Sequence, residues 1–290
     1  MRARKLLPLG IPGIVFLAVI GLVCTGCRPG SAVNGESEDP AIQEVERVGG
    51  VCRRASDMRG ECAPDYLKEV EGNPVVEVDL CNEGVVLTRR PRGRDHVTDA
   101  ALTKFHLLKE IRVLSLNDTG VTDAGLKELA PLRRLTQLHL LKTRVTDAGL
   151  KELAAFEDLW ELDLGSTGVT DAGMKDVAKL RSLTQLDLAW TTVGDAGLAE
   201  LTALPQLYSL HLGHAPVTDV GAGHLSRIKT LSSLDLSATA VTDAGVKDLA
   251  KLPRLRYLSL SKEKVTLPAA KELRQAIPDC AVYLDGTHVK

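Results

Sequence analysis

Acidic, histidine and serine side chains recur at one position in every 24 residues between residues 115 and 259. Carboxylates and imidazoles exchange protons near neutral pH, and both bind Zn²⁺. A row of such groups has three interpretations: a hydrolytic or metal site, a polar recognition surface, or a solvated face without a ligand. The elements that carry the row decide between them. In chain order its members are Ser115, His139, Asp163, Asp187, His211, Asp235 and Ser259.

The same 24-residue interval runs through a tripeptide motif. Val-Thr-Asp begins at Val97 and recurs without insertion up to Val241, with one change to Val-Gly-Asp at Val193. It ends as Val-Thr-Leu at Val265. A fixed period of this length is the signature of a solenoid, in which each unit packs only against its neighbours.

One unit, residues 121–144, divides into a predicted helix and a predicted strand. In Asp-Ala-Gly-Leu-Lys-Glu-Leu-Ala the two leucines share one helical face, and Thr122 or Asp123 is expected to cap the helix start. The second half alternates, so Leu138 and Leu140 turn inward and His139 turns outward. Stacked units would form a parallel sheet with strands about 4.8 Å apart.

This arrangement places the recurring acidic and imidazole side chains on one face of the sheet as a ladder. Asp163 beside Asp187 is expected to be repulsive, and His139 and His211 flank the pair and could share protons with it. Trp190 and His214 fall one repeat apart at the strand exits. The next column of outward positions reads Gln137, Glu161, Gln185, Ser209, Ser233 and Tyr257.

The favoured interpretation of this face is recognition of a protein or peptide, because aromatic residues dominate such contact sites. A nearly flat row seldom converges four ligands on one ion, so neither a metal nor a cofactor is expected. P-loop, HExxH and GxSxG motifs do not occur, so the chain is predicted not to be an enzyme. The predicted contact residues are His139, Glu161, Asp163, Gln185, Asp187, Trp190, His211, His214, Asp235 and Tyr257.

The pattern LxxLxLxxT followed by VTDAGLKELAxLxxL resembles the leucine-rich repeat, in particular its cysteine-containing and GALA-like subtypes. The resemblance covers about residues 75–285. It implies an α/β right-handed solenoid (horseshoe) with a parallel sheet on the concave face and short helices on the convex face. It also implies a hydroxyl ladder, a column of threonines at equivalent positions of successive repeats. Ala215 and Glu263 interrupt this column, whose members are Thr119, Thr143, Thr167, Thr191 and Thr239.

The first residues resemble an export signal. Arg2, Arg4 and Lys5 precede 18 uncharged residues, and Gly26-Cys27 resembles the lipobox of bacterial lipoproteins, with Cys24 where Leu is usual. An ordinary cleaved signal and an uncleaved anchor are the alternatives, and all three place the rest of the chain outside the cytoplasm. Arg28 after the anchor cysteine, in place of an inner-membrane retention Asp, slightly favours the outer membrane.

Cysteine positions restrict the disulfides. Cys280 lies about eight strand spacings from Cys81, roughly 38 Å, which is far beyond disulfide reach. It is therefore predicted to be a lone buried thiol. Any bridge would lie among Cys52, Cys62 and Cys81 near the start of the array, and three unpaired thiols are the alternative.

The predicted organisation has five parts. Residues 1–27 are the signal and 28–40 a flexible tether. Residues 41–95 form an N-terminal cap with the first strand and a basic loop that contains Arg89, Arg90, Arg92 and Arg94. The 24-residue repeats occupy 96–265, and 266–290 form a C-terminal cap.

Composition agrees with repetition. Aromatic residues are 3% of the 290, while hydrophobic residues are 44%, as expected when every unit reuses the same small aliphatic positions. The net charge of -2 gives no pull toward nucleic acid. The chain is thus predicted to be a monomeric, exported, lipid-anchored scaffold that binds an unknown protein or peptide. A ubiquitin-ligase substrate receptor, by resemblance to F-box leucine-rich-repeat proteins, and a hydrolase or metal site on the ladder are the alternatives.

Overall fold

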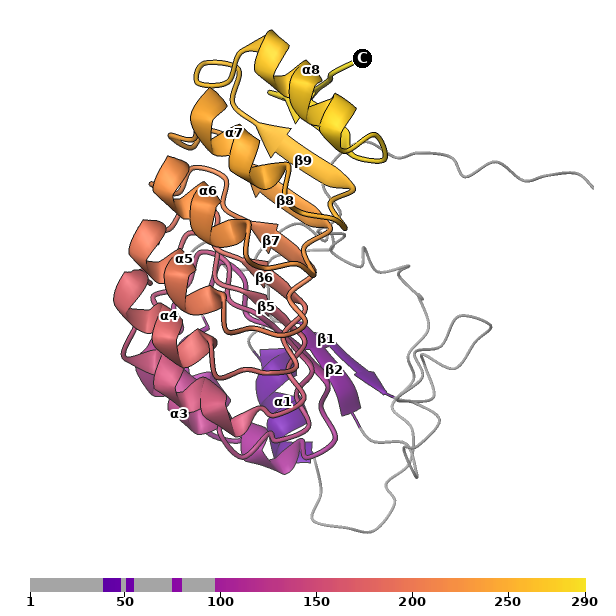
Figure 1. The fold of residues 1–290 in the computed structure, drawn as a ribbon. Coiled ribbons are helices and arrows are strands. Elements are labelled where there is room, and N and C mark those ends of the chain that lie inside the picture. Colours follow the sequence, from indigo (N-terminus) through magenta and orange to yellow (C-terminus); the bar gives the residue numbers. More distant parts are fainter. Residues whose placement is uncertain (1–38, 48–50, 55–74, 80–96) are drawn as a thin grey trace, which may run out of the picture. The chain divides into compact units, whose positions relative to one another are not determined.

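A computed structural model describes residues 39–47, 51–54, 75–79 and 97–290 (Figure 1). These residues belong to one compact unit that spans residues 36–290. The predicted export signal, Cys62, Cys81 and the basic loop at residues 89–94 lie outside the described residues. The same holds for all of the predicted tether except its last two residues, which belong to helix α1 (Asp39–Arg47).

Parallel strands β2 to β10 form the body of the sheet, and each pairs with the next strand in the chain. Partners in the repeats are offset by 24 residues, as in Leu138 with Leu162 and Leu162 with Leu186. The predicted register is therefore confirmed. The strands are β2 (Val75–Asp79), β3 (Val113–Ser115), β4 (Gln137–His139), β5 (Glu161–Asp163), β6 (Gln185–Asp187), β7 (Ser209–His211), β8 (Ser233–Leu236), β9 (Tyr257–Leu260) and β10 (Ala281–Leu284).

Each end of the parallel run carries a short antiparallel strand that the sequence did not predict. β1 (Val51–Arg54) pairs with β2, and β11 (Thr287–His288) pairs with β10. Both give partners to edges that would otherwise present open hydrogen-bonding groups.

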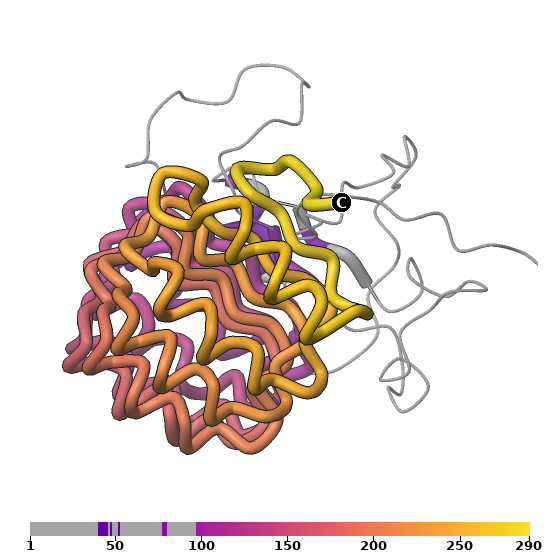
Figure 2. The backbone as a smooth tube through the Cα atoms, turned by 45° about the horizontal axis from the view of Figure 1, so that its top comes forward, coloured from indigo at the N-terminus to yellow at the C-terminus, as the bar shows by residue number. Residues whose placement is uncertain are grey.

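Short helices cover one face of the sheet, and consecutive helices pack against one another (Figures 1 and 2). One unit forms a 3₁₀ helix, η4, although its ten residues Val-Thr-Asp-Ala-Gly-Leu-Lys-Glu-Leu-Ala are identical to those of the preceding unit. The helices that follow α1 are α2 (Asp99–Leu102), η3 (Phe105–Leu107), α3 (Asp123–Leu129), η4 (Gly149–Ala155), α4 (Asp171–Val177), α5 (Asp195–Leu201), α6 (Asp219–Leu225), α7 (Asp243–Leu249) and α8 (Leu267–Ala276).

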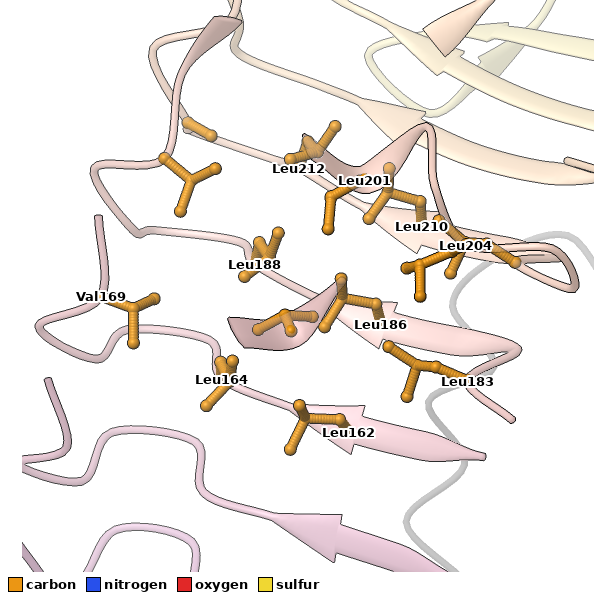
Figure 3. Packing of buried hydrophobic residues seen from close by; sticks show 14 of the residues in the cluster. Leu162, Leu164, Val169, Leu183, Leu186, Leu188, Leu201, Leu204, Leu210 and Leu212 are labelled. Carbon is orange, nitrogen blue, oxygen red and sulfur yellow. The ribbon is translucent and has the colours of Figure 1, made fainter. Parts of the chain in front are cut away.

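The core is a stack of equivalent leucines between the helices and the sheet (Figure 3). Leu162, Leu186 and Leu210 follow one another on adjacent strands, and each is buried. Burying such a side chain contributes about 1.5–3 kcal/mol, so the array gains most of its stability from contacts between neighbouring units.

The Val-Thr-Asp motif clamps each unit to the next. Asp123 accepts hydrogen bonds from the main-chain N–H and from the hydroxyl of Thr146, at 2.8 and 2.7 Å. We call this arrangement the Asp–Thr clamp. It recurs at Asp99–Thr122, Asp147–Thr170, Asp195–Thr218, Asp219–Thr242 and Asp243–Thr266.

The clamp decides between the two predicted helix caps. Thr122 accepts a hydrogen bond from Ala124 N and is the N-cap of α3, whereas Asp123 lies inside the helix and reaches the next unit. The clamp also explains the following glycine. A Cβ atom at Gly125 would lie 2.4 Å from Oδ1 of Asp99, so a side chain there would displace the carboxylate.

The hydroxyl ladder implied by the resemblance is present. Thr119 donates from its hydroxyl to the Leu116 carbonyl at 2.6 Å, and Thr143, Thr167, Thr191 and Thr239 repeat this bond three residues back in their own units. Ala215 and Glu263 have no hydroxyl to contribute.

The structure places elements in both predicted caps: most of α1 and all of β2 fall within residues 41–95, and α8 and β10 fall within residues 266–290. Cys280 is buried as predicted, and burial raises the pKa of its thiol to about 12. Cys52 lies on β1, at the opposite end of the sheet order. Disulfide pairing among Cys52, Cys62 and Cys81 stays a prediction, because two of the three lie outside the described residues.

Candidate functional site

The face of the sheet away from the helices carries the ladder, and we call it the open face. Ser115, His139 and Asp163 are direct partners on β3, β4 and β5, and the pairing continues to Ser259. The ladder also extends beyond its predicted ends, to Asp79 on β2 and Tyr283 on β10. The structure thus brings the predicted ladder together in one row.

The second column runs beside the ladder in the same register. Glu161 and Gln185 are partners on β5 and β6, and Ser233 and Tyr257 are partners on β8 and β9. The middle residue of each strand between β3 and β7 is buried, which confirms that the flanking positions face away from the core.

The ladder aspartates are less available to a partner than an open polar surface would require. Asp163 is only 4% exposed, and its contact with a partner stays a prediction. Its Oδ1 accepts a hydrogen bond from Gly165 N at 2.9 Å. Asp187 and Asp235 accept the equivalent bonds from Ala189 N and Ser237 N, at 2.7 and 2.8 Å. All three carboxylates therefore also stabilise the turn that follows their strand.

Burial and like charge perturb the adjacent pair Asp163 and Asp187. Burial and the neighbouring Asp187 carboxylate raise the pKa of Asp163 to about 7. The hydrogen bond from Gly165 N acts in the opposite direction and lowers this pKa, but it does not outweigh them. Burial likewise raises the pKa of Asp187, although the Ala189 hydrogen bond and His211 oppose this. The predicted repulsion within this pair therefore has a physical counterpart: near neutral pH, one carboxyl group is partly protonated.

Both predicted histidines lie beside carboxylates, but they do so differently. His211 Nδ1 lies 3.7 Å from Oδ2 of its ladder neighbour Asp187. His139 Nε2 instead lies 3.3 Å from Oε1 of Glu161, in the second column, where Gln137 also donates to the carboxylate. Burial alone would raise the pKa of Glu161, but His139 and Gln137 outweigh it and hold that pKa below its usual value.

Trp190 and His214 form a stacked pair at the strand exits. Their ring centroids are 3.5 Å apart with an interplanar angle of 15°, and Trp190 is 62% exposed. Both residues have left-handed backbone conformations, with φ values of 58° and 64°. A bulky residue in this region costs roughly 1–2 kcal/mol relative to glycine, so the fold retains an exposed aromatic at an unfavourable backbone position.

Tyr208 was missed by sequence reasoning, although it is 54% exposed. It directly precedes β7, at the strand entry, and Trp160 occupies the same position two strands earlier. The available signal was this recurrence of an aromatic residue just before the outward columns. β6 and β7 therefore carry one exposed aromatic at each edge, Tyr208 at the entry of β7 and Trp190 at the exit of β6.

The C-terminal end of the open face is also aromatic. Tyr257 and Tyr283 have ring centroids 5.1 Å apart, and Tyr283 lies 5.2 Å from the His288 ring. Of the predicted contact residues, Tyr257 thus belongs to a separate cluster from the Trp190–His214 pair.

Among the described residues, no three His, Cys, Asp or Glu side chains gather in a way that could hold a metal ion. In the same part of the chain, no helix combines the length and apolar character needed to cross a bilayer.

A family comparison agrees with this geometry. Residues 111–130, 179–201 and 228–250 match the family described as leucine-rich repeat. The chain is a leucine-rich-repeat solenoid. Among solved structures, the solenoid is similar to internalin C2 from Listeria monocytogenes, with 23% identity and a TM-score of 0.48 over 64% of this chain and 80% of that chain. No curated protein sequence matches the solenoid.

The matched repeats support a role as a protein-binding scaffold. All three matched segments lie within the array of short helices and parallel strands. The repeat subtype and the individual contact residues of the solenoid stay predictions.

Proposed function

We propose that this protein is an exported, lipid-anchored scaffold that binds a protein or peptide through the open face of its leucine-rich-repeat solenoid. The carrying observation is the strip across β6 and β7. There the in-register polar columns lie between Tyr208 at one edge and the stacked Trp190 and His214 at the other. A partner crossing the strands would meet an aromatic anchor at each side and hydrogen-bonding groups between them.

Rigidity of the strip favours binding. Side chains on β6 and β7 are held in register by main-chain pairing, and the leucines beneath them are buried. A preformed surface loses little conformational entropy when a partner docks, which improves affinity for a given contact area.

Export and anchoring rest on the first 27 residues. The basic start, the uncharged stretch and Gly26-Cys27 support lipidation at Cys27, and residues 28–38 would then link the anchor to the unit that begins near α1. The scaffold would work outside the cytoplasm as a membrane-bound monomer, with outer-membrane sorting favoured by Arg28.

Site-specific crosslinking tests the proposed face. A photo-reactive phenylalanine analogue replaces Tyr208 in the full-length protein, expressed in its native host and irradiated in intact cells. The same analogue at Glu200, which is exposed on α5, is the matched control for the helix side. A protein crosslinked from position 208 and not from position 200 is expected. Once purified, it should bind W190A/H214A at least about tenfold more weakly than wild type, since aromatic anchors each contribute upward of about 1 kcal/mol.

Two results would contradict the proposal. Crosslinks that form only from position 200 would place the contact on the helices. Unchanged affinity of the purified partner for W190A/H214A would show that the aromatic edge takes no part in binding.

A further inference from the structure

We infer that the partner segment bound by the open face is basic, with arginine or lysine side chains placed over the ladder and against Trp190. This inference rests on the proposed function and specifies the chemistry of the partner. It follows from the separation of charge between the two faces of the repeats.

Among the described residues, the central strands of the open face carry carboxylates and no lysine or arginine. Strands β5 to β8, with the residues just before and after them, contain four acidic residues and no lysine or arginine. His211 is the one imidazole on these strands. The four carboxylates are Glu161, Asp163, Asp187 and Asp235.

The basic residues of the same repeats lie elsewhere. Between residues 155 and 242 every lysine and arginine belongs to a helix or to the connection that leads from a helix to the next strand. Lys179, for example, pairs with Asp176 at 2.6 Å on the helix side. The set is Lys175, Lys179, Arg181, Arg227 and Lys229. The whole chain is close to neutral at -2, so the acidity of the open face is a local property of this surface.

The described neighbours leave the central carboxylates with little charge compensation. Asp163 and Asp187 accept hydrogen bonds from main-chain amides, and the imidazole of His211 on the next strand lies 3.7 Å from the Asp187 carboxylate. Glu161 is the exception, since His139 and Gln137 contact it. A guanidinium or ammonium group from a partner would supply the missing opposite charge, and this is the complementarity that steers and orients charged partners.

The aromatic edge suits the same ligand. Trp190 is exposed, and its ring stacks on His214 one repeat later, at the exits of β6 and β7 next to Asp187 and His211. A cation over an indole face is attracted by the ring quadrupole, and tryptophan is the best of the aromatic residues for this contact. A chain of alternating basic residues could therefore place one cation near Asp187 and the next on Trp190.

Peptide binding tests the inference. Full-length protein in a non-ionic detergent is titrated into a fluorescein-labelled peptide that alternates arginine and serine. Matched peptides carry citrulline or glutamate in place of arginine. We expect anisotropy to report binding of the arginine peptide alone, and that binding should weaken as salt is raised.

Variants locate the contact. D187N/D235N should weaken binding of the arginine peptide about tenfold, the loss expected from two partly exposed ion pairs. E128Q/E200Q makes the same change in net charge on the exposed helix side and should leave binding unchanged. W190A should weaken binding of the arginine peptide. The anisotropy of the citrulline peptide, which is not expected to bind, should be the same with W190A as with the wild type.

Equal binding of the arginine and citrulline peptides would overturn the inference, as would equal losses in D187N/D235N and E128Q/E200Q. These failures are distinct from failure of the proposed function. A crosslinked partner that needs Trp190 and His214, and that the arginine peptide does not displace, would keep the scaffold and remove the basic partner.

Discussion

Asp195 of one repeat accepts two hydrogen bonds from Thr218 of the next, at 2.9 Å from the main-chain N–H and at 2.6 Å from the hydroxyl. The carboxylate occupies the space that a side chain at Gly221 would need, because a Cβ atom there would lie 2.4 Å from Oδ1 of Asp195. The clamp, the cap and the glycine are therefore one structural unit, repeated along the array.

Two glycines of α6 give opposite predictions. G221A should destabilise the protein by about 2 kcal/mol or more, because it forces the clamp apart at a buried site. G223A should stabilise it by about 0.5–1 kcal/mol, since a Cβ atom there meets only Asp248 Oδ2, at 3.7 Å, and alanine favours the helix. Chemical denaturation of both variants checks this, and a G221A variant as stable as wild type would contradict the role of the clamp.

Asp163 makes stability depend on pH. Its pKa rises from 3.8 to about 7 on folding, so the native state binds more protons than the unfolded state between these values. Stability should therefore fall as pH rises from about 4 to about 7, by at most about 4 kcal/mol from this group.

D163N isolates this effect. The amide oxygen can still accept from Gly165 N, but the side chain no longer ionises. The variant should be more stable than wild type near pH 8 and differ little near pH 4. E200Q is the control on an exposed site. Urea midpoints at the two pH values measure the difference, and parallel pH profiles for D163N and wild type would show that Asp163 is not the group responsible.

Trp190 should show opposite effects on stability and binding. W190G removes a bulky side chain from a left-handed residue with φ of 58° and should stabilise the protein by about 1 kcal/mol. It should also abolish partner crosslinking from position 208. A238G relieves the same backbone conformation two repeats later, with φ of 53°, and should stabilise similarly without loss of binding. Thermal melts and crosslinking of both variants test this pair of effects, and a loss of binding in A238G would point to the backbone.

Cys27 should determine membrane attachment. Cells that express the wild-type protein should incorporate labelled palmitate into it, and C27A should incorporate none. Wild-type protein should sediment with membranes. Release of C27A into the soluble extracytoplasmic fraction is expected if the apolar stretch is cleaved by another route, whereas unlabelled wild-type protein would argue for an ordinary signal or an uncleaved anchor.

The 24-residue interval was sufficient to predict the register and both outward columns, because parallel pairing of identical units leaves only one alignment that keeps every leucine inside. It was not sufficient to predict the environment of Asp163. The repeat gives Asp163, Asp187 and Asp235 equivalent positions, and only Asp163 is buried.

Local backbone conformation could not be predicted from the sequence where it depends on packing. The same ten residues form α3 in one unit and η4 in the next, and the residues that follow them differ, Pro131 in one case and Ala155 with the buried Phe156 in the other. The left-handed conformation of Trp190 had no local signal, since no glycine marks it. From the sequence, the Asp of each clamp was expected only as a helix cap. Its hydrogen-bond partner in the structure is the Thr of the next unit, 23 residues further along the chain, and no local pattern indicates that bond.

One clamp is incomplete, and it lies beside the proposed binding strip. Gly194 donates to Asp171 through its main-chain N–H at 2.6 Å, but it has no hydroxyl for the second bond. The joint between α4 and α5 thus has one clamp bond where the other described joints have two. If a bound partner pulled the solenoid against its membrane anchor, tension would run in series through the joints between the anchor and the bound strands. Among these joints the array would be expected to part first at the one between α4 and α5, so that mechanical load would disturb the binding strip before the joints nearer the anchor open.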